Sequence, residues 1–169
     1  MLSNFQIEDM FRTYNTPLVG VFMKNQLPRK VVDGNYVINL ASAPSGGTHW
    51  LSLRIKGKEA FYADSFGAPM PVEIIAFAKQ RKGITIGYSN VILQNISSEN
   101  CGYFATAILV YLERNKTKPM FDVARQYMRQ FKTDSKQNDD VLRRVYQSFS
   151  HTTPALIKRL DNEKIHYEN

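Results

Sequence analysis

The chain of 169 residues contains a single cysteine, Cys101, and only three histidines, His49, His151 and His166. One cysteine cannot form a disulfide within the chain, which excludes the class of small secreted proteins held together by disulfides. It also excludes zinc sites built from several cysteines, and the scattered histidines do not suggest another kind of metal site. We therefore expect no metal and no resident cofactor.

Long hydrophobic runs are also lacking. The longest, Tyr103 to Leu112, is too short to cross a bilayer, and residues 1–15 lack the basic start and apolar core of a signal peptide. We therefore expect a monomer that is neither secreted nor bound to a membrane. The length predicts a single domain over residues 1–169, with a core at about 18–115 and a C-terminal helical region at about 119–165.

Acidic residues are outnumbered, 15 to 22, which gives a formal charge of +7. The excess is concentrated between Arg114 and Lys136, where seven basic residues accompany two acidic ones. Such a stretch can bind phosphates or another polyanion, or it can simply be the solvated face of a helix. The candidate DNA-binding residues are Arg114, Lys116, Lys118, Arg125, Arg129 and Lys132.

The pattern of apolar residues predicts strands in the middle of the chain and helices around them. Residues 50–55 alternate between apolar and polar positions, and a polar turn at 56–59 leads into a second apolar segment, AFYADSF. Residues 35–41 and one or two segments within 83–94 are also expected to be strands. Helices are expected at 4–14, 72–82, 102–115, 122–132 and 139–149, with one more after Thr153. This order indicates an α+β fold with a central mixed sheet packed by helices.

Cys101 stands where a polar loop meets the expected helix at 102–115. This helix is apolar on nearly every side, which indicates that it is buried. Ser97, Ser98 and Asn100 are all suitable N-cap residues, so the helix should begin close to Cys101. Free backbone N–H groups at a helix N-terminus stabilise a thiolate, the nucleophilic form of cysteine. The alternative is an inert, buried cysteine.

A nucleophilic thiol requires a base, and His49 is the candidate. It shares the parity of the apolar residues in 51–55, which predicts that it lies on the inward face of its strand. The alternative is an ordinary core or loop histidine. His151 and His166 lie in the polar C-terminal region and are poorer candidates.

Asp64 is the candidate for the carboxylate that orients the base. If Lys56 pairs with Glu59 across the turn, Leu51 faces Asp64, and His49 is the diagonal neighbour of Asp64 on the same face. A three-residue turn would instead place Asp64 on the opposite face. The alternative is that Asp64 caps the turn that follows it.

Acyl transfer at Cys101 would also require donors for the oxyanion. The backbone N–H of Cys101 is one natural donor. Gln94 ends the strand-like segment VILQ, and the loop that follows could return its side-chain amide to Cys101. Asn95 is the rival, and an ordinary surface glutamine is the alternative.

The four candidate residues lie in three motifs, which follow one another along the chain in the order GGTHW, FYADSFG and Q-x6-CGYF. Together they resemble the adenovirus maturation protease, adenain, and its relatives in virophages and Polinton-type transposons. The SUMO-deconjugating proteases are more distantly similar, with the same order of His-Trp, Asp, Gln and Cys-Gly. The resemblance covers residues 46–112 and implies a papain-related, adenain-like cysteine protease fold.

The resemblance implies a catalytic role for four residues. Cys101 would attack the scissile carbonyl, and His49 would act as the general base and then as the acid for the leaving amine. Asp64 would orient His49, at a position where adenain-like enzymes often have Glu. Gln94 would complete the oxyanion hole.

Three further residues are expected to bind substrate or to lie beside it. The resemblance implies that Trp50 packs next to the catalytic residues, although strand parity alone would point it away from His49. Gly102 lacks a side chain at a place where a substrate backbone would need to approach, and Gly47 belongs to the same group. A core or surface-covering aromatic is the alternative for Trp50.

The resemblance also implies substrates and partners. These would be capsid or core precursor proteins, cut next to glycine or other small residues in the virion or the infected cell. Adenain is activated by DNA and by a peptide tethered through a disulfide. The only thiol here is the candidate nucleophile, so a peptide activator would have to bind non-covalently. The rivals are a protease that removes ubiquitin-like modifiers and a non-catalytic module that binds DNA or capsid.

Overall fold

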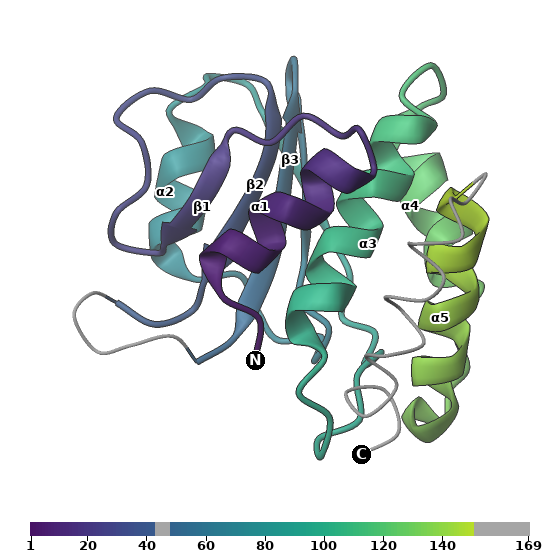
Figure 1. Ribbon diagram of the computed structural model, residues 1–169. Helices are drawn as coiled ribbons and strands as arrows, with labels where there is room; N and C mark the ends of the chain where they lie inside the picture. Colours follow the sequence, from purple (N-terminus) through teal and green to yellow (C-terminus); the bar gives the residue numbers. More distant parts are fainter. Residues whose placement is uncertain (43–47, 151–169) are drawn as a thin grey trace.

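The structure, a computed structural model, describes residues 1–42 and 48–150 (Figure 1). Within these ranges, five strands form one mixed sheet in the order β1-β2-β3-β4-β5. The inner strands are antiparallel, whereas β1 pairs with β2 and β4 with β5 in parallel. The strands are β1 (Gly20–Met23), β2 (Gly34–Asn39), β3 (Trp50–Lys56), β4 (Glu59–Ala63) and β5 (Thr85–Tyr88).

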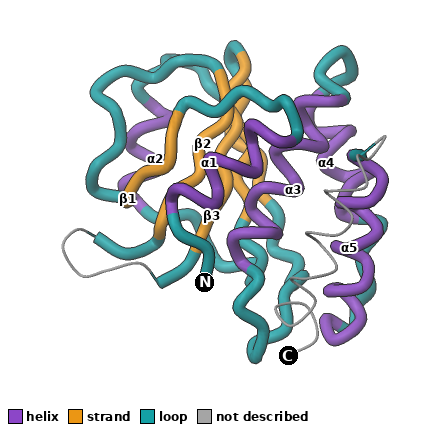
Figure 2. The backbone as a smooth tube through the Cα atoms, in the orientation of Figure 1, coloured by secondary structure: helices purple, strands orange, loops and turns teal. Residues whose placement is uncertain are grey.

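Helices cover both faces of this sheet, so the predicted α+β class is confirmed (Figures 1 and 2). One face packs against α2, and the other packs against α3, with α1, α4 and α5 around it. Gly47 and the helix expected after Thr153 lie outside the described residues. The helices are α1 (Asn4–Thr13), α2 (Val72–Lys79), α3 (Cys101–Arg114), α4 (Met120–Met128) and α5 (Asn138–Phe149), with a short 3-10 turn, η1 (Ser135–Gln137).

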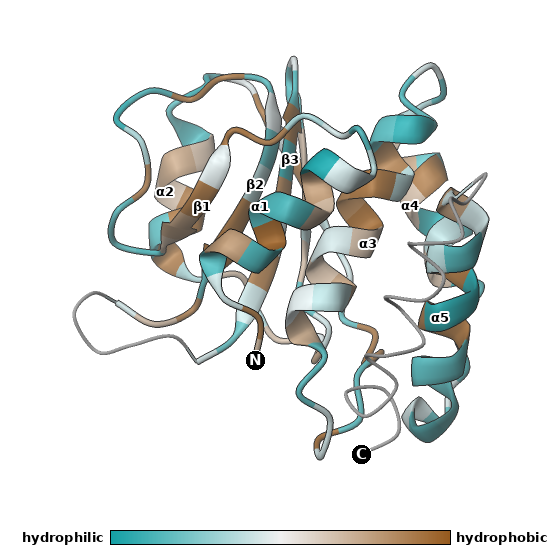
Figure 3. Cartoon of the chain, in the orientation of Figure 1, coloured by the Kyte–Doolittle hydropathy of each residue, from teal (hydrophilic) through white to brown (hydrophobic). Residues whose placement is uncertain are grey.

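The helix α3 is the central element of its layer. As expected from its all-round apolar sequence, most of its residues are buried, and it lies between β3 on one side and α5 on the other. Figure 3 shows the contrast in hydropathy between α3 and the largely hydrophilic outer surface of α5. The buried core therefore holds the N-terminus of α3 in a fixed place next to the sheet.

Two polar contacts fix α3 along β3. The Ser52 hydroxyl donates a hydrogen bond of 2.8 Å to the carbonyl of Ala105. Near the other end, the buried Arg54 guanidinium lies 2.5 Å from the Glu113 carboxylate and also donates to the side chain of Asn35. A buried charge is tolerated only when it is paired in this way. These contacts set the register of the helix against the strand.

Of the one or two strands expected within 83–94, one is present as β5, and VILQ does not form a second one. Residues 89–94 form no strand, and the side chains of Val91 and Ile92 are exposed. The backbone N–H groups of Leu93 and Gln94 both donate to the Ser65 carbonyl, so the chain turns inward after β5 instead of pairing along the sheet. The β-branched residues that suggested a strand therefore belong to a loop.

Candidate active site

Cys101 is the first residue of α3 and is 4% exposed. The preceding residue, Asn100, is the N-cap, but its side chain makes no capping hydrogen bond to the helix. The first N–H groups of this 14-residue helix therefore remain available to stabilise negative charge near the thiol.

His49 and Asp64 meet at the end of the β3–β4 hairpin. The observed register pairs Lys56 with Glu59, the alternative that places Asp64 on the face of His49, and ends at Ser52 with Ala63. His49 directly precedes β3 and Asp64 directly follows β4, and the His49 Nε2 lies 2.6 Å from the Asp64 Oδ1. Since Nε2 bonds the carboxylate, Nδ1 is the ring nitrogen left for another partner.

Cys101 also acts on the imidazole. Burial lowers the pKa of His49, but hydrogen bonds and charge interactions with Asp64 and with Cys101 raise it more strongly, to about 9 from the usual 6.5. The imidazole therefore interacts with a carboxylate on one side and a sulfur on the other. At neutral pH this environment favours the protonated ring, the form that stabilises a neighbouring thiolate.

Phe66 is a site residue that the sequence argument missed. Its ring stacks on the His49 imidazole, with centroids 4.7 Å apart and planes at 23°. Its backbone N–H donates to the same Asp64 Oδ1 at 2.9 Å, so that oxygen accepts from both His49 and Phe66. Phe66 thereby orients both side chains. The turn at 65–67 was the only sequence signal for it, and a turn carries no such role by itself.

Gln94 is 1% exposed, so it is not a surface glutamine. The Ser65 hydroxyl donates to its side-chain oxygen at 2.6 Å, and its amide nitrogen donates to the Ser98 carbonyl at 2.6 Å. An amide nitrogen carries two hydrogens, so a second one remains after this bond. Ser65, which the sequence argument also missed, therefore determines which end of the Gln94 amide faces the segment before Cys101.

Gly67 allows the Gln94 loop to approach the Asp64 turn. Its φ of +68° lies in the left-handed region, and a Cβ there would come within 2.6 Å of the Asn90 carbonyl oxygen. Only glycine satisfies both conditions. The two loops that carry the candidate carboxylate and amide are thus in direct backbone contact.

Trp50 and Gly102 contact each other, but not in the way expected for Gly102. A Cβ at Gly102 would lie 2.9 Å from the Leu2 side chain and 3.2 Å from Trp50 Cδ1. Trp50 Nε1 in turn donates to the Leu2 carbonyl at 2.9 Å. The space left by Gly102 is therefore filled by the N-terminal segment and the indole rather than left open for a substrate backbone.

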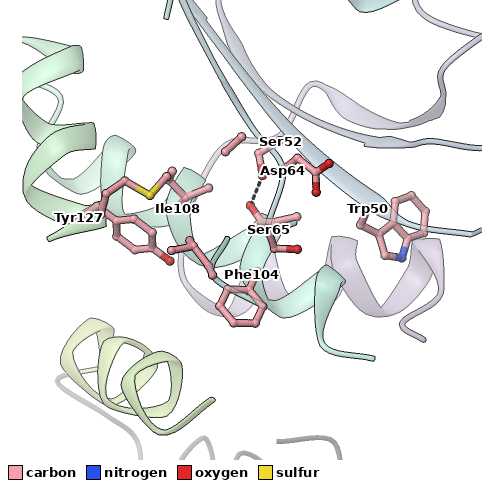
Figure 4. A pocket seen from close by; sticks show the side chains of 11 residues that line it. Trp50, Ser52, Asp64, Ser65, Phe104, Ile108 and Tyr127 are labelled. Atoms are coloured by element: carbon pink, nitrogen blue, oxygen red, sulfur yellow. Dashed lines mark hydrogen bonds between the residues drawn. The ribbon is translucent and has the colours of Figure 1, made fainter. Parts of the chain in front are cut away.

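A small cavity of about 10 Å³ lies behind the site (Figure 4). Asp64 and Ser65 line it from one side, and Phe104 and Tyr127 line it from α3 and α4. This volume holds about one water molecule and no larger ligand. Within the described residues, no group of three or more His, Cys, Asp or Glu side chains is arranged to hold a metal ion.

Neither a protein-family model nor a curated protein sequence matches the chain. Among solved structures, a crystal structure of the ASFV pS273R protease is similar at 18% identity and a TM-score of 0.48, covering 73% of this chain and 60% of that one. A structure of AvrA with IP6 and CoA has 14% identity and a TM-score of 0.42, covering 96% of this chain and 67% of that one. The chain thus spans 60% of the length of the ASFV protease chain.

The candidate DNA-binding residues do not share one environment. Arg114 donates to the backbone carbonyls of Phe149 and Tyr14, and its guanidinium lies 5.4 Å from the centre of the Phe149 ring. These contacts join α3 to the ends of α1 and α5, which gives Arg114 a role inside the fold. All six residues are exposed, Arg114 included. Lys116 and Arg125 pair with nearby acidic residues, and the set is completed by Lys118, Arg129 and Lys132.

No helix among the described residues has the length and apolar character that a membrane span requires.

Proposed function

We propose that this chain is a cysteine endopeptidase. One arrangement carries the proposal: the His49 ring bonds Asp64 through Nε2 and interacts with the Cys101 sulfur at the N-terminus of α3. Nucleophile, base and orienting carboxylate in this order form the arrangement by which a thiol is activated for acyl transfer.

The proposed reaction has two stages. The Cys101 thiolate attacks the scissile carbonyl, and the protonated His49 then gives its proton to the departing amine. In the second stage, His49 takes a proton from water, which attacks the thioester and releases the acid. Asp64 holds the ring in one orientation throughout, and Phe66 holds the carboxylate and the ring in position relative to each other.

The oxyanion would be bound by two donors. The backbone N–H of Cys101 is the first, because it lies at the start of a helix. The remaining amide hydrogen of Gln94 is the second, since Ser65 and Ser98 hold the rest of that amide. Buried donors of this kind lower the barrier by about 3–4 kcal/mol each.

The proposed substrates are capsid or core precursor polypeptides cut beside glycine or other small residues. The motifs GGTHW, FYADSFG and Q-x6-CGYF support this choice, through their resemblance to the adenain-like proteases. A protease that removes ubiquitin-like modifiers would share the same chemistry. A panel that compares capsid-precursor peptides with ubiquitin-like fusion proteins distinguishes the two substrate classes.

The activity can be tested without a known substrate by incubating the protein with a proteome-derived peptide library and identifying the new termini by mass spectrometry. We expect the wild type to cut beside small residues, and Cys101→Ala and His49→Ala to abolish cutting. Circular dichroism should show that both variants are folded. Equal cleavage by the wild type and Cys101→Ala would refute the proposal.

A further inference from the structure

The segment 93–100 determines how the two proposed oxyanion donors lie relative to each other. Gln94 is near its start, and Cys101 directly follows its end. It contains no helix or strand, yet Gln94 and Asn100 are 1% and 0% exposed. No helix or strand holds this segment, so its position depends on individual backbone and side-chain hydrogen bonds.

The helix α5 supplies those bonds at both ends of the segment. At one end, the Asn138 side-chain amide donates to the Leu93 carbonyl at 3.0 Å. At the other, the Asp139 carboxylate accepts from the Asn100 amide at 3.2 Å. Each contacted residue directly precedes one of the two proposed donors. Two adjacent residues of one helix therefore hold the chain next to both.

Further bonds make this attachment rigid. Asn138, the first residue of α5, also donates to the Lys132 carbonyl at 2.9 Å and accepts from the Lys132 N–H at 2.7 Å, so its side chain is fixed on both ends of the amide. Ser98 also acts on the Asp139 carboxyl group, and it lowers the pKa of that group as Asn100 does. The Asn100 side chain thus serves Asp139 instead of capping its own helix.

Asp139 is not explained by stability. Burial raises its pKa to about 6; Asn100, Arg143 and Ser98 act in the opposite direction, and Asp140 adds to the rise. A carboxyl group whose pKa rises on folding opposes folding increasingly as the pH rises above its ordinary value of 3.8, and fully above pH 6.

We propose that Asp139, together with Asn138, is a positioning residue that sets the separation between the Gln94 amide and the Cys101 backbone N–H. This inference rests on the proposed function. It assigns a task to α5: to hold the oxyanion-binding segment, although the helix contributes no group to the reaction itself. Loss of the Asp139 bonds should slow acyl transfer, because that reaction needs both oxyanion donors. Simple alkylation of the thiol needs neither donor, so its rate should be unchanged.

The test compares two reactions of Cys101 at pH 7.5 in the full chain. Acylation is followed as the burst of p-nitrophenolate from p-nitrophenyl acetate, and alkylation as the loss of free thiol to iodoacetamide. We expect Asp139→Ala to lower the acylation rate about tenfold and to change alkylation less than twofold. Asp139→Asn keeps an acceptor for Asn100 and should recover most of the acylation rate. Asp140→Ala, an exposed neighbour, is the matched control.

The outcomes separate the two proposals. An acylation rate within threefold of the wild type in a folded Asp139→Ala, or an Asp139→Asn as slow as Asp139→Ala, would overturn the positioning role. If Asp139→Ala does not fold, the acylation rate of Ser98→Ala is measured instead, because this variant removes the other loop partner of Asp139. A rate within threefold of the wild type would again overturn the positioning role. A wild type that shows no acylation burst, or Cys101→Ala that still shows one, would instead overturn the proposed function and this inference with it.

Discussion

Asp64→Asn removes the negative charge beside His49 and keeps the shape of the side chain. The amide oxygen can still accept from the Phe66 N–H and from the imidazole, so the local geometry should persist. In the wild type, Asp64 and Cys101 together overcome the effect of burial and raise the pKa of His49 to about 9. Relative to 6.5, this corresponds to about 3 kcal/mol in favour of the protonated ring.

Without the carboxylate, the effect of burial remains and one of the two favourable partners is lost. We therefore expect the pKa of His49 in Asp64→Asn to fall by at least about one pH unit. The measurement is an NMR titration of the imidazole carbon-bound protons, with His49→Gln to assign the signal. A pKa within about half a pH unit of the wild type would refute the idea that Asp64 maintains the charge of this ring.

The same variant has a consequence for stability. The raised pKa of His49 stabilises the fold fully below pH 6.5, and this contribution is lost as the pH rises through 9. The Tm of the wild type should therefore fall between pH 6.5 and 9.5 by several degrees more than that of Asp64→Asn. Parallel Tm curves for the two proteins would contradict the assignment.

Three further changes have defined outcomes. Gly67→Ala should lower the free energy of unfolding by about 2–4 kcal/mol in a urea titration, because its positive φ and the Asn90 carbonyl both oppose a side chain. Ser65→Ala should slow acylation about tenfold in the p-nitrophenolate burst, because the Gln94 amide loses the bond that orients it. Arg114→Ala should lower the Tm by several degrees and leave any DNA affinity unchanged in fluorescence anisotropy; a weaker affinity with an unchanged Tm would restore it as a DNA-binding residue.

The β3–β4 hairpin shows which parts of the fold local sequence patterns can predict. Its alternation and its polar turn predicted a hairpin, and the Lys56–Glu59 register, one of the two that were open, brings His49 to Asp64. A slip of one residue would have reversed which side chains lie on each face. The apolar sequence of α3 similarly predicted a buried helix, and the polar residues before it predicted a start close to Cys101.

Contacts between loops were not predictable in the same way. The bonds of Ser65 to Gln94 and of Phe66 to Asp64 depend on how two irregular segments fold back on each other, and no periodicity encodes that. VILQ does not form a strand although its β-branched residues favour one, because the N–H groups of Leu93 and Gln94 bond the Ser65 carbonyl instead of a neighbouring strand. Gly102 was interpreted from its neighbour in sequence, whereas its contact in space is Leu2.

The solitary thiol also has a consequence for redox chemistry. If an oxidant converts Cys101 to a sulfenic acid, no second cysteine in the chain can condense with it to form a protective internal disulfide. The oxidised sulfur can then be reduced by an external thiol or proceed to the irreversible sulfinic acid. Recovery of this chain from peroxide should therefore depend on the concentration of glutathione or a similar reductant around it.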